Sequence, residues 1–129
     1  MSGPPKHEQI RQVFAGLPED ELTALTTWMT ELEVDEGATL VARDDYGTTL
    51  YCITAGEAEV TTEPGEPAVL LGPGDTFGEI GLLLTGQRTA TVRARTPMRL
   101  LALSGHDFDR IQAHLPELEQ ALRRISRER

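Results

Sequence analysis

The sequence has little that would suit an exported, membrane-spanning or nucleic-acid-binding protein. Its 129 residues include a single cysteine, Cys52, so an internal disulfide is excluded and we expect a cytoplasmic protein. An apolar run of about 18 residues, enough to span a membrane, is missing, and the segment Met1–Lys6 lacks the apolar stretch of a secretory signal. Positive charge is scarce, since 12 Lys and Arg face 21 Asp and Glu, for a net charge of −9. Nucleic acid requires a basic surface, so this chain alone is not expected to bind it.

Histidine is also scarce, with three residues in the chain, and this argues against a metalloenzyme. A small β-barrel could be a cupin-type metalloenzyme, which needs histidines and a carboxylate converging on one metal. All three histidines fall outside the predicted strands: His7 lies in a predicted N-terminal helix, and His106 and His114 lie in the C-terminal helical region. Ser104 and Asp107 are too close to His106 in sequence to form a catalytic triad. We therefore expect no enzyme, no metal site and no cofactor.

The length and the hydrophobic period predict a single domain over residues 1–129. Helical spacing extends over residues 1–31, alternation with a period of two follows over 32–103, and helical spacing returns over 104–129. The N-terminal helices are expected to cover one end of the β-structure.

Two helices are predicted in the N-terminal segment. Residues 16–18 separate them, and three acids after Pro18 suit the first turn of the second helix. The apolar stripes are Ile10, Val13, Phe14 and Leu17 in the first helix, and Leu22, Leu25, Met29 and Leu32 in the second.

The middle segment predicts short strands separated by regularly spaced turns. In the strand at 49–55, Leu50 and Cys52 share one face while Tyr51 and Ile53 share the other. Further strands are expected at Thr39–Ala42, Ala68–Leu71, Ala90–Ala94 and Met98–Leu103. Strands and turns of this kind predict a small antiparallel barrel or sandwich.

A hairpin is predicted around Gly56. This glycine separates the strand Thr49–Ala55 from Ala58–Thr61, where Ala58 and Val60 alternate with polar residues. The alternation predicts a strand pair with one solvated face.

The stretch Phe77–Thr91 interrupts the β-structure and carries the chemistry. Gly78 and Glu79 open a short apolar run that suits one or two helical turns, whose first backbone N–H groups attract anions. Arg88 follows after the loop at 85–87, and its planar donors suit a phosphate, which could then be held from two sides. Glu79 accepts hydrogen bonds when ionised and would suit a sugar hydroxyl. These residues predict a small ligand with one phosphate and a free ribose hydroxyl.

From Phe77 to Ala94 the chain reads FGEIGLLLTGQRTATVRA. This stretch resembles the phosphate-binding cassette of cyclic-nucleotide-binding domains, which occur in catabolite-activator-type regulators, cyclic-nucleotide-dependent kinases and cyclic-nucleotide-gated channels. The match has no gap, although Gln87 stands where many members carry proline. The resemblance implies a mainly β fold with flanking helices: an antiparallel, jelly-roll-like β-roll (a double-stranded β-helix) with an internal phosphate-binding helix in the cassette 77–91 and C-terminal hinge and lid helices.

The resemblance also implies roles for individual residues. In the family, the position of Glu79 takes the ribose 2′-hydroxyl, the position of Arg88 pairs with the cyclic phosphate, and backbone N–H groups complete the cradle. The implied ligand-binding residues of the cassette are Phe77, Gly78, Glu79, Ile80, Gly81, Leu82, Arg88, Thr89 and Ala90. Thr89 resembles cGMP-responsive members, where its hydroxyl can reach the guanine, but it could equally cap the phosphate. Both cAMP and cGMP stay candidates, with cAMP first.

The C-terminal segment is predicted to be helical. Ser104 and Asp107 resemble a capping box, and Pro116 starts a second helix. The apolar stripe consists of Phe108, Ile111, Leu115, Leu118, Leu122 and Ile125. Such a stripe usually packs on its own domain. In the family, the last helix is a lid over the base, which implies base contact by Leu118, Ala121, Leu122 and Ile125.

We therefore predict a regulatory or sensor domain that binds cAMP or cGMP and moves its C-terminal helix upon binding. The alternative is a domain of the same fold that has lost the nucleotide and serves as a protein-interaction module. A DNA-binding output would need a helix-turn-helix after the lid, and we expect none in this chain. The expected partners are the nucleotide and either an effector domain, covalently linked or separate, or a second copy in a homodimer.

Overall fold

The computed structural model describes residues 5–41, 49–62, 66–78 and 90–128, with side chains up to Ile125. The helical elements are α1 (Lys6–Val13), α2 (Glu19–Trp28), α3 (Gly105–Ile111), the 3-10 helix η2 (Gln112–His114) and α4 (Pro116–Glu128). The strands are β1 (Thr30–Val34), β2 (Thr39–Val41), β3 (Leu50–Ala55), β4 (Ala58–Thr61), β5 (Val69–Leu71), β6 (Thr76–Phe77), β7 (Thr91–Ala94) and β8 (Met98–Leu103).

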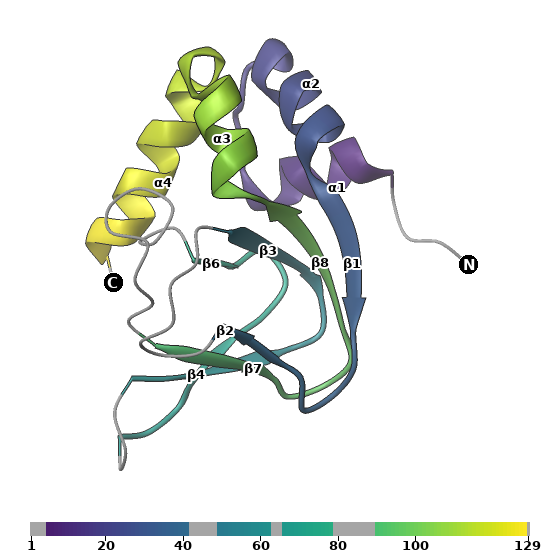
Figure 1. Ribbon diagram of the computed structural model, residues 1–129, viewed down its shortest axis with the longest axis vertical. Helices are drawn as coiled ribbons and strands as arrows, with labels where there is room; N and C mark the ends of the chain where they lie inside the picture. Colours follow the sequence, from purple (N-terminus) through teal and green to yellow (C-terminus); the bar gives the residue numbers. More distant parts are fainter. Residues whose placement is uncertain (1–4, 42–48, 63–65, 79–89, 129) are drawn as a thin grey trace.

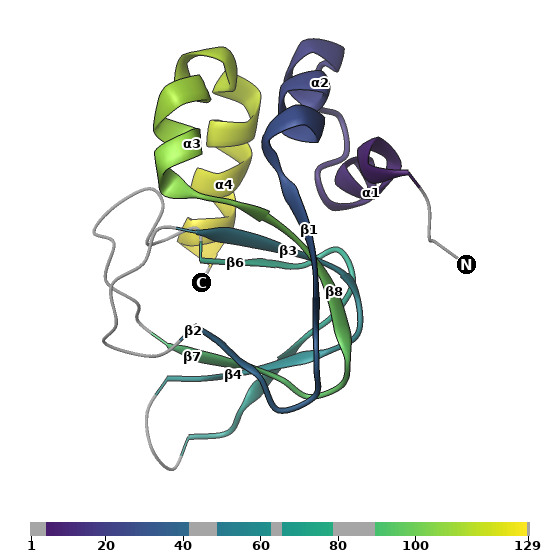
Figure 2. The same cartoon turned by 45° about the vertical axis from the view of Figure 1, so that its right-hand side comes forward.

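The strands form two four-stranded antiparallel sheets, with the orders β1-β8-β3-β6 and β2-β7-β4-β5. The successive pairs β1–β2, β3–β4, β5–β6 and β7–β8 occupy the same places in opposite sheets, so each of these connections carries the chain around a corner. The helices gather beyond the β1-β8-β3-β6 sheet, on the side away from the other sheet (Figures 1 and 2). This arrangement confirms the predicted mainly β, antiparallel roll with flanking helices.

The corners of the roll are tied to one another by hydrogen bonds. Arg95 N donates to Glu57 O at 2.9 Å, and Glu57 N donates to Thr96 Oγ1 at 3.0 Å. At the neighbouring corner, Gly37 N donates to Ala94 O at 2.7 Å. The β1–β2, β3–β4 and β7–β8 corners therefore satisfy backbone groups of one another or of the adjoining strand.

The hairpin predicted around Gly56 is wrong. The strand β3 pairs with β8 and β6, whereas β4 pairs with β5 and β7. Gly56 has a φ of 88°, and a Cβ atom there would lie 2.4 Å from Pro97 O. The glycine lets the chain leave one sheet close against the β7–β8 corner, so the two strands diverge instead of pairing.

Two hydrophobic clusters share the β1-β8-β3-β6 sheet. The helical cluster, between this sheet and the helices, comprises Ile10, Phe14, Leu22, Leu25, Met29, Leu50, Cys52, Leu101, Leu103, Phe108, Ile111, Leu115, Leu118 and Leu122. The roll cluster, between the two sheets, comprises Val41, Ile53, Ala58, Phe77, Val92, Ala94, Met98 and Leu100. Along β3, Leu50 and Cys52 pack in the helical cluster while Ile53 and the partly buried Tyr51 pack in the roll cluster, which confirms the predicted alternation.

The N-terminal helices cover one end of the roll, as predicted. Leu22 and Leu25 are buried, but the stripe does not continue as helix to Leu32. The helix α2 ends at Trp28, and β1 begins at Thr30, so the β-structure starts earlier than predicted. The reason is that β8 offers a partner strand: Leu32 lies opposite Leu100 in the ladder and is 36% exposed.

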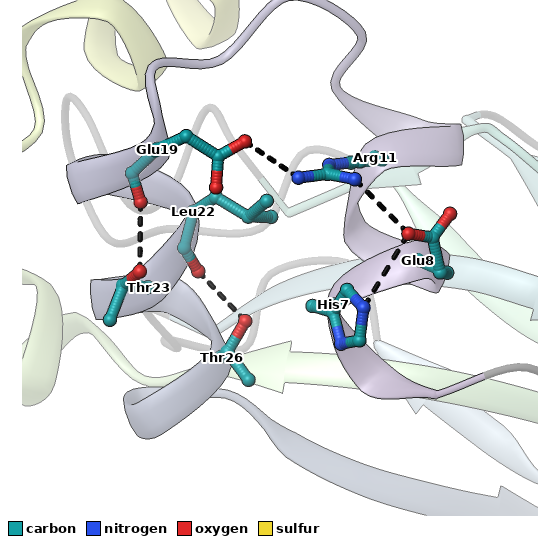
Figure 3. Close-up of polar contacts among 7 residues, drawn as sticks. All are labelled: His7, Glu8, Arg11, Glu19, Leu22, Thr23 and Thr26. Atoms are coloured by element: carbon teal, nitrogen blue, oxygen red, sulfur yellow. Dashed lines mark hydrogen bonds and ion pairs between the residues drawn. The ribbon is translucent and has the colours of Figure 1, made fainter.

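A small polar network joins α1 to α2 at the surface (Figure 3). Arg11 reaches Glu19 Oε1 at 2.6 Å with Nη2 and Glu8 Oε1 at 3.1 Å with Nη1. Lys6 Nζ also donates to Thr26 O at 2.8 Å. The ion pairs are exposed, so each stabilises the helix pair by about 1 kcal/mol or less.

The C-terminal helices begin where the sequence predicts. Ser104 Oγ accepts a hydrogen bond from Asp107 N at 3.1 Å, and Pro116 is the first residue of α4. The stripe residues Phe108 and Leu115 are buried in the helical cluster. Within the described ranges, no helix has the length and apolar character needed to cross a bilayer.

Candidate functional site

The predicted cassette joins β6 of one sheet to β7 of the other. Of its candidate residues, the structure describes Phe77, Gly78 and Ala90. The other candidates lie outside the described residues: Glu79, Ile80, Gly81, Leu82, Arg88 and Thr89. The described residues therefore define the frame from which the cassette starts and to which it returns.

The start of the cassette is fixed by an aromatic stack. Phe77 is buried in the roll cluster, and its ring stacks on that of Tyr51 with centroids 5.0 Å apart and an interplanar angle of 21°. The two residues are also register partners of β6 and β3. Gly78 follows with a φ of 90°, a left-handed conformation that glycine adopts without strain. Phe77 thus anchors the strand end, and Gly78 redirects the chain into the cassette.

The turn before β6 is itself held in place. Asp75 Oδ2 accepts a hydrogen bond from Gly72 N at 2.8 Å, and Asp75 N donates to Gly72 O at 3.0 Å. The same turn binds β3, because Ile53 N donates to Asp75 O and Gly74 N donates to Ile53 O, both at 2.9 Å. The first end of the cassette is therefore set by two neighbouring structural elements.

The far end of the cassette enters the second sheet. Ala90 is partly buried at a bend, and β7 begins immediately afterwards at Thr91. Since β7 lies between β2 and β4, with Thr91 opposite Thr61, this end is held by strands on both sides.

The predicted base-contacting residues lie in α4. Leu118 and Leu122 are buried in the helical cluster, while Ala121 and Ile125 are partly buried against it. The helix runs from the group of helices above the β1-β8-β3-β6 sheet down to the height of β6, where the cassette starts (Figures 1 and 2). In this position the apolar face of α4 packs on its own domain, so base contact by the fully buried Leu118 and Leu122 would require them to become exposed. Base contact by all four residues, Ala121 and Ile125 included, stays a prediction.

A groove of about 280 Å³ runs along one side of α4, from Glu117 in its first turn to Ile125. It is lined on one side by residues 13–17, which join α1 to α2, and on the other by Glu117, Ala121, Arg124 and Ile125. The face of α4 that borders this groove is therefore partly open, whereas Leu118 and Leu122 are fully buried.

Sequence reasoning missed the role of Glu21. This side chain is 2% exposed, and its two oxygens accept hydrogen bonds from the backbone N–H groups of Glu117 and Leu118. The sequence assigned it only to the acidic first turn of its own helix. Its position one helical turn before Leu25, on the buried side of α2, is the signal that could have found it.

The described residues contain no group of three or more His, Cys, Asp or Glu side chains that could hold a metal ion. His7 lies in α1, His106 in α3 and His114 in η2, which are the regions expected from the sequence. Cys52, the single cysteine of the chain, is buried in the helical cluster.

The sequence was also compared with known protein families. The family described as cyclic nucleotide-binding domain matches residues 31–114, which span β1 to η2 and include the whole cassette. The chain belongs to this family. The predicted resemblance is thereby confirmed, as is the class of function, a cyclic-nucleotide-binding regulatory domain.

Individual relatives agree with this membership. A cyclic nucleotide-gated potassium channel of Rhizobium etli is 35% identical over 96 residues, which cover 74% of this chain and 26% of the channel. The N-terminal domain of a transcriptional regulator from Streptomyces coelicolor A3(2) has a TM-score of 0.73 at 31% identity, covering 95% of this chain and 90% of that one. The regulatory domain of Toxoplasma gondii PKA, solved with cAMP, has a TM-score of 0.75 at 28% identity, covering 94% of this chain and 49% of that one.

The chain spans only about a quarter of the first curated relatives that it matches, 28% and 26% of their lengths. The remaining parts of those proteins have no counterpart within the 129 residues. The comparisons therefore concern the domain, and any output that it controls is a separate question.

Proposed function

We propose that this domain binds a cyclic nucleotide in the 77–91 cassette, with cAMP as the first candidate. The backbone N–H groups at the predicted helical start of the cassette, together with Arg88, would hold the cyclic phosphate, and Glu79 would accept a hydrogen bond from the ribose 2′-hydroxyl. The proposed ligand-binding residues of the cassette are Phe77, Gly78, Glu79, Ile80, Gly81, Leu82, Arg88, Thr89 and Ala90.

The observation that carries this proposal is the family match across the entire cassette, with both Glu79 and Arg88 in place. The geometry supports it, because Phe77 and Gly78 fix the start of the cassette in one sheet while β7 fixes its end in the other. A ligand-binding loop held at both ends by a rigid roll loses less entropy on binding than a free loop would.

The choice of cAMP rests on the relatives. The Toxoplasma gondii PKA regulatory domain was solved with cAMP, and so was the cAMP-bound PfPKA-R fragment, which is 28% identical with a TM-score of 0.72. Thr89 keeps cGMP as the second candidate, because a threonine hydroxyl could reach the guanine amino group. Comparing Thr89→Ala with the wild type separates the two readings: selective loss of cGMP supports base contact, and equal loss of both nucleotides supports a phosphate cap.

We further propose that ligand binding moves α4. Leu118 and Leu122 are fully buried and can contact the base only if they leave the helical cluster, so the domain would exchange between a packed position of α4 and a closed position over the nucleotide. A ligand drives this exchange only through its difference in affinity for the two states. The result would be a population shift that an effector domain or a separate partner protein could sense.

The test is calorimetric titration of the purified chain with cAMP, cGMP and 5′-AMP. We expect binding of the cyclic nucleotides and much weaker or no binding of 5′-AMP. Arg88→Leu should weaken cyclic-nucleotide binding by on the order of 2 to 4 kcal/mol, because it leaves a phosphate charge without its counterpart. The control is Arg95→Leu, which removes an exposed arginine at the β7–β8 corner. Equal affinity for cAMP and 5′-AMP, or equal effects of the two substitutions, would contradict the proposal.

The relatives also suggest what kind of protein this domain works with. Channels and kinase regulatory subunits of the family carry the domain as one part of a longer protein, so we propose that this domain regulates an effector, either covalently linked or as a separate chain. The presence of a single cysteine, Cys52, accords with the proposed cytoplasmic location.

A further inference from the structure

Glu21 is the only charged side chain that the described residues bury. A buried carboxylate is costly unless its oxygens are hydrogen-bonded. Its Oε1 accepts from Leu118 N at 2.9 Å, and its Oε2 accepts from Glu117 N at 3.1 Å. Each oxygen therefore has a backbone donor, and both donors belong to a helix 96 or 97 residues further along the chain.

The first turn of α4 has two backbone N–H groups without a partner inside the helix, and both can donate to this carboxylate. The first backbone N–H groups of any helix have no partner within the helix. In α4 the first residue is Pro116, which has no N–H, and Glu119 N donates to Leu115 O at 2.9 Å. Only the N–H groups of Glu117 and Leu118 are left, and Glu21 accepts from both. The negative charge also lies at the positive end of the helix dipole.

This contact stabilises one position of α4. If the helix left the helical cluster to contact a nucleotide base, Glu21 would lose both donors, and two N–H groups would lose their acceptor. A groove of about 280 Å³, which runs from Glu117 to Ile125, leaves part of the contact between α4 and residues 13–17 open. The two hydrogen bonds to Glu21 therefore contribute directly to holding α4 in the packed position.

We propose that Glu21 is a positioning residue that holds α4 in the packed position and thereby lowers the affinity of the domain for its cyclic nucleotide. The inference rests on the proposed function, because it takes nucleotide binding and the movement of α4 as given. Glu21 lies on α2, which precedes the β-roll in the chain. The N-terminal helices would thus set the threshold at which the ligand moves the C-terminal helix.

The test compares Glu21→Gln with the wild type. Glutamine keeps the size of the side chain but places an NH₂ group against a backbone N–H, so one hydrogen bond is lost and the charge is removed. We expect the Kd for cAMP, measured by calorimetry, to fall about tenfold, the equivalent of one charge-assisted hydrogen bond released from the packed state. Amide hydrogen exchange over residues 117–125 should also become faster in the ligand-free protein.

The control is Asp20→Asn, which removes the same charge from an exposed neighbour on the same helix. It should change neither the Kd nor the exchange over residues 117–125. Glu21→Asp is the second variant: it keeps the charge, but its shorter side chain cannot bring both oxygens to the two N–H groups. If Glu21→Gln does not fold, Glu21→Asp should still bind cAMP more tightly than the wild type does.

The direction of the change distinguishes positioning from plain structural support. Loss of a merely structural contact would destabilise the fold and leave cAMP affinity unchanged or weakened, and either outcome in the folded variants would overturn the proposal. If the wild type bound no cyclic nucleotide, the proposed function would fail by itself. The role of Glu21 would then rest on exchange alone: faster exchange of residues 117–125 in Glu21→Gln than in Asp20→Asn supports it, and equal exchange overturns it.

Discussion

The helical cluster and the roll cluster lie on opposite faces of the same sheet, but they are closed in different ways. The roll cluster is enclosed by hydrogen-bonded strands and by corners that satisfy one another's backbone groups. The helical cluster is closed on its outer side by helices that depend on side-chain packing and on the buried contact from Glu21 to α4. Different parts of one protein open with different free energies, and a part that is joined to the rest by few backbone hydrogen bonds can open separately. We infer that the roll is the fixed frame of the domain and that the helical cluster is its movable part.

The sharpest way to test this comparison uses two neighbours on β8. Leu100 faces the roll cluster and Leu101 faces the helical cluster, and both are buried. We expect Leu100→Ala and Leu101→Ala each to lower the free energy of unfolding by about 2 to 5 kcal/mol, because both leave a cavity in a packed core. Chemical denaturation of the two variants measures this loss.

The two leucine variants should differ in local exchange. Leu101→Ala is expected to speed amide exchange in α4 at temperatures where the strands stay protected, since it loosens only the seat of the helices. Leu100→Ala should not do so below its global unfolding transition. Equal acceleration in α4 by both variants would mean that the two clusters unfold as one unit.

The corner at Gly56 sharpens the claim that the roll is a close-packed frame. Gly56 and Gly37 have the same φ of 88°, but a Cβ at Gly56 would meet Pro97 O at 2.4 Å, whereas a Cβ at Gly37 would have no atom within 4 Å. Both alanine variants add backbone strain of about 1 to 3 kcal/mol. Gly56→Ala should cost clearly more in thermal unfolding, because the backbone must also shift. Equal losses at the two positions would show that the corners are not tightly packed.

The cap of α3 gives a smaller effect on the movable side. Ser104→Ala removes the acceptor for Asp107 N and should lower the free energy of unfolding by about 1 kcal/mol. Ser104→Thr keeps a hydroxyl at the cap and should recover most of that loss. If Ser104→Thr also lowered the free energy of unfolding by about 1 kcal/mol, the hydroxyl cap would not be the stabilising feature of Ser104.

The ion pairs of Arg11 with Glu8 and Glu19 should have the smallest effect. Arg11→Met keeps part of the aliphatic stem and should cost about 0.2 to 1 kcal/mol at low salt, because these charges are exposed. The difference from wild type should shrink in 1 M salt, which screens charges beyond about 3 Å. A loss that persists in high salt would indicate packing of the side chain, not charge.

Part of this fold could be read from the sequence because it depends on local rules. Ser104 and Asp107 are three residues apart, and that spacing alone predicts the helix cap. The alternation along this strand predicts that Leu50 and Cys52 share one face and Ile53 lies on the other, since the period of two assigns each residue to a face. The cassette was found in the same way, from residues close together in the chain.

The features that could not be predicted depend on distant partners. Leu32 lies in a strand because β8 pairs with β1. From the sequence alone, Leu32 continues the apolar stripe of the second helix. The divergence of β3 and β4 at Gly56 was decided by the approach of Pro97 from another corner. Glu21 finds its partners 96 and 97 residues away, and no local pattern contains that information. The ligand-binding roles of the cassette residues from Glu79 to Thr89 remain predictions.

The central claim is that a fixed roll carries a movable α4, and amide hydrogen exchange of the wild type with and without saturating cAMP tests it most directly. We predict that cAMP changes the exchange of residues 117–125 while the exchange of β8, over residues 98–103, stays the same. Calorimetry on the same sample verifies that cAMP is saturating. Unchanged exchange of residues 117–125 under these conditions, or an equal change in the exchange of β8 and α4, would contradict the account.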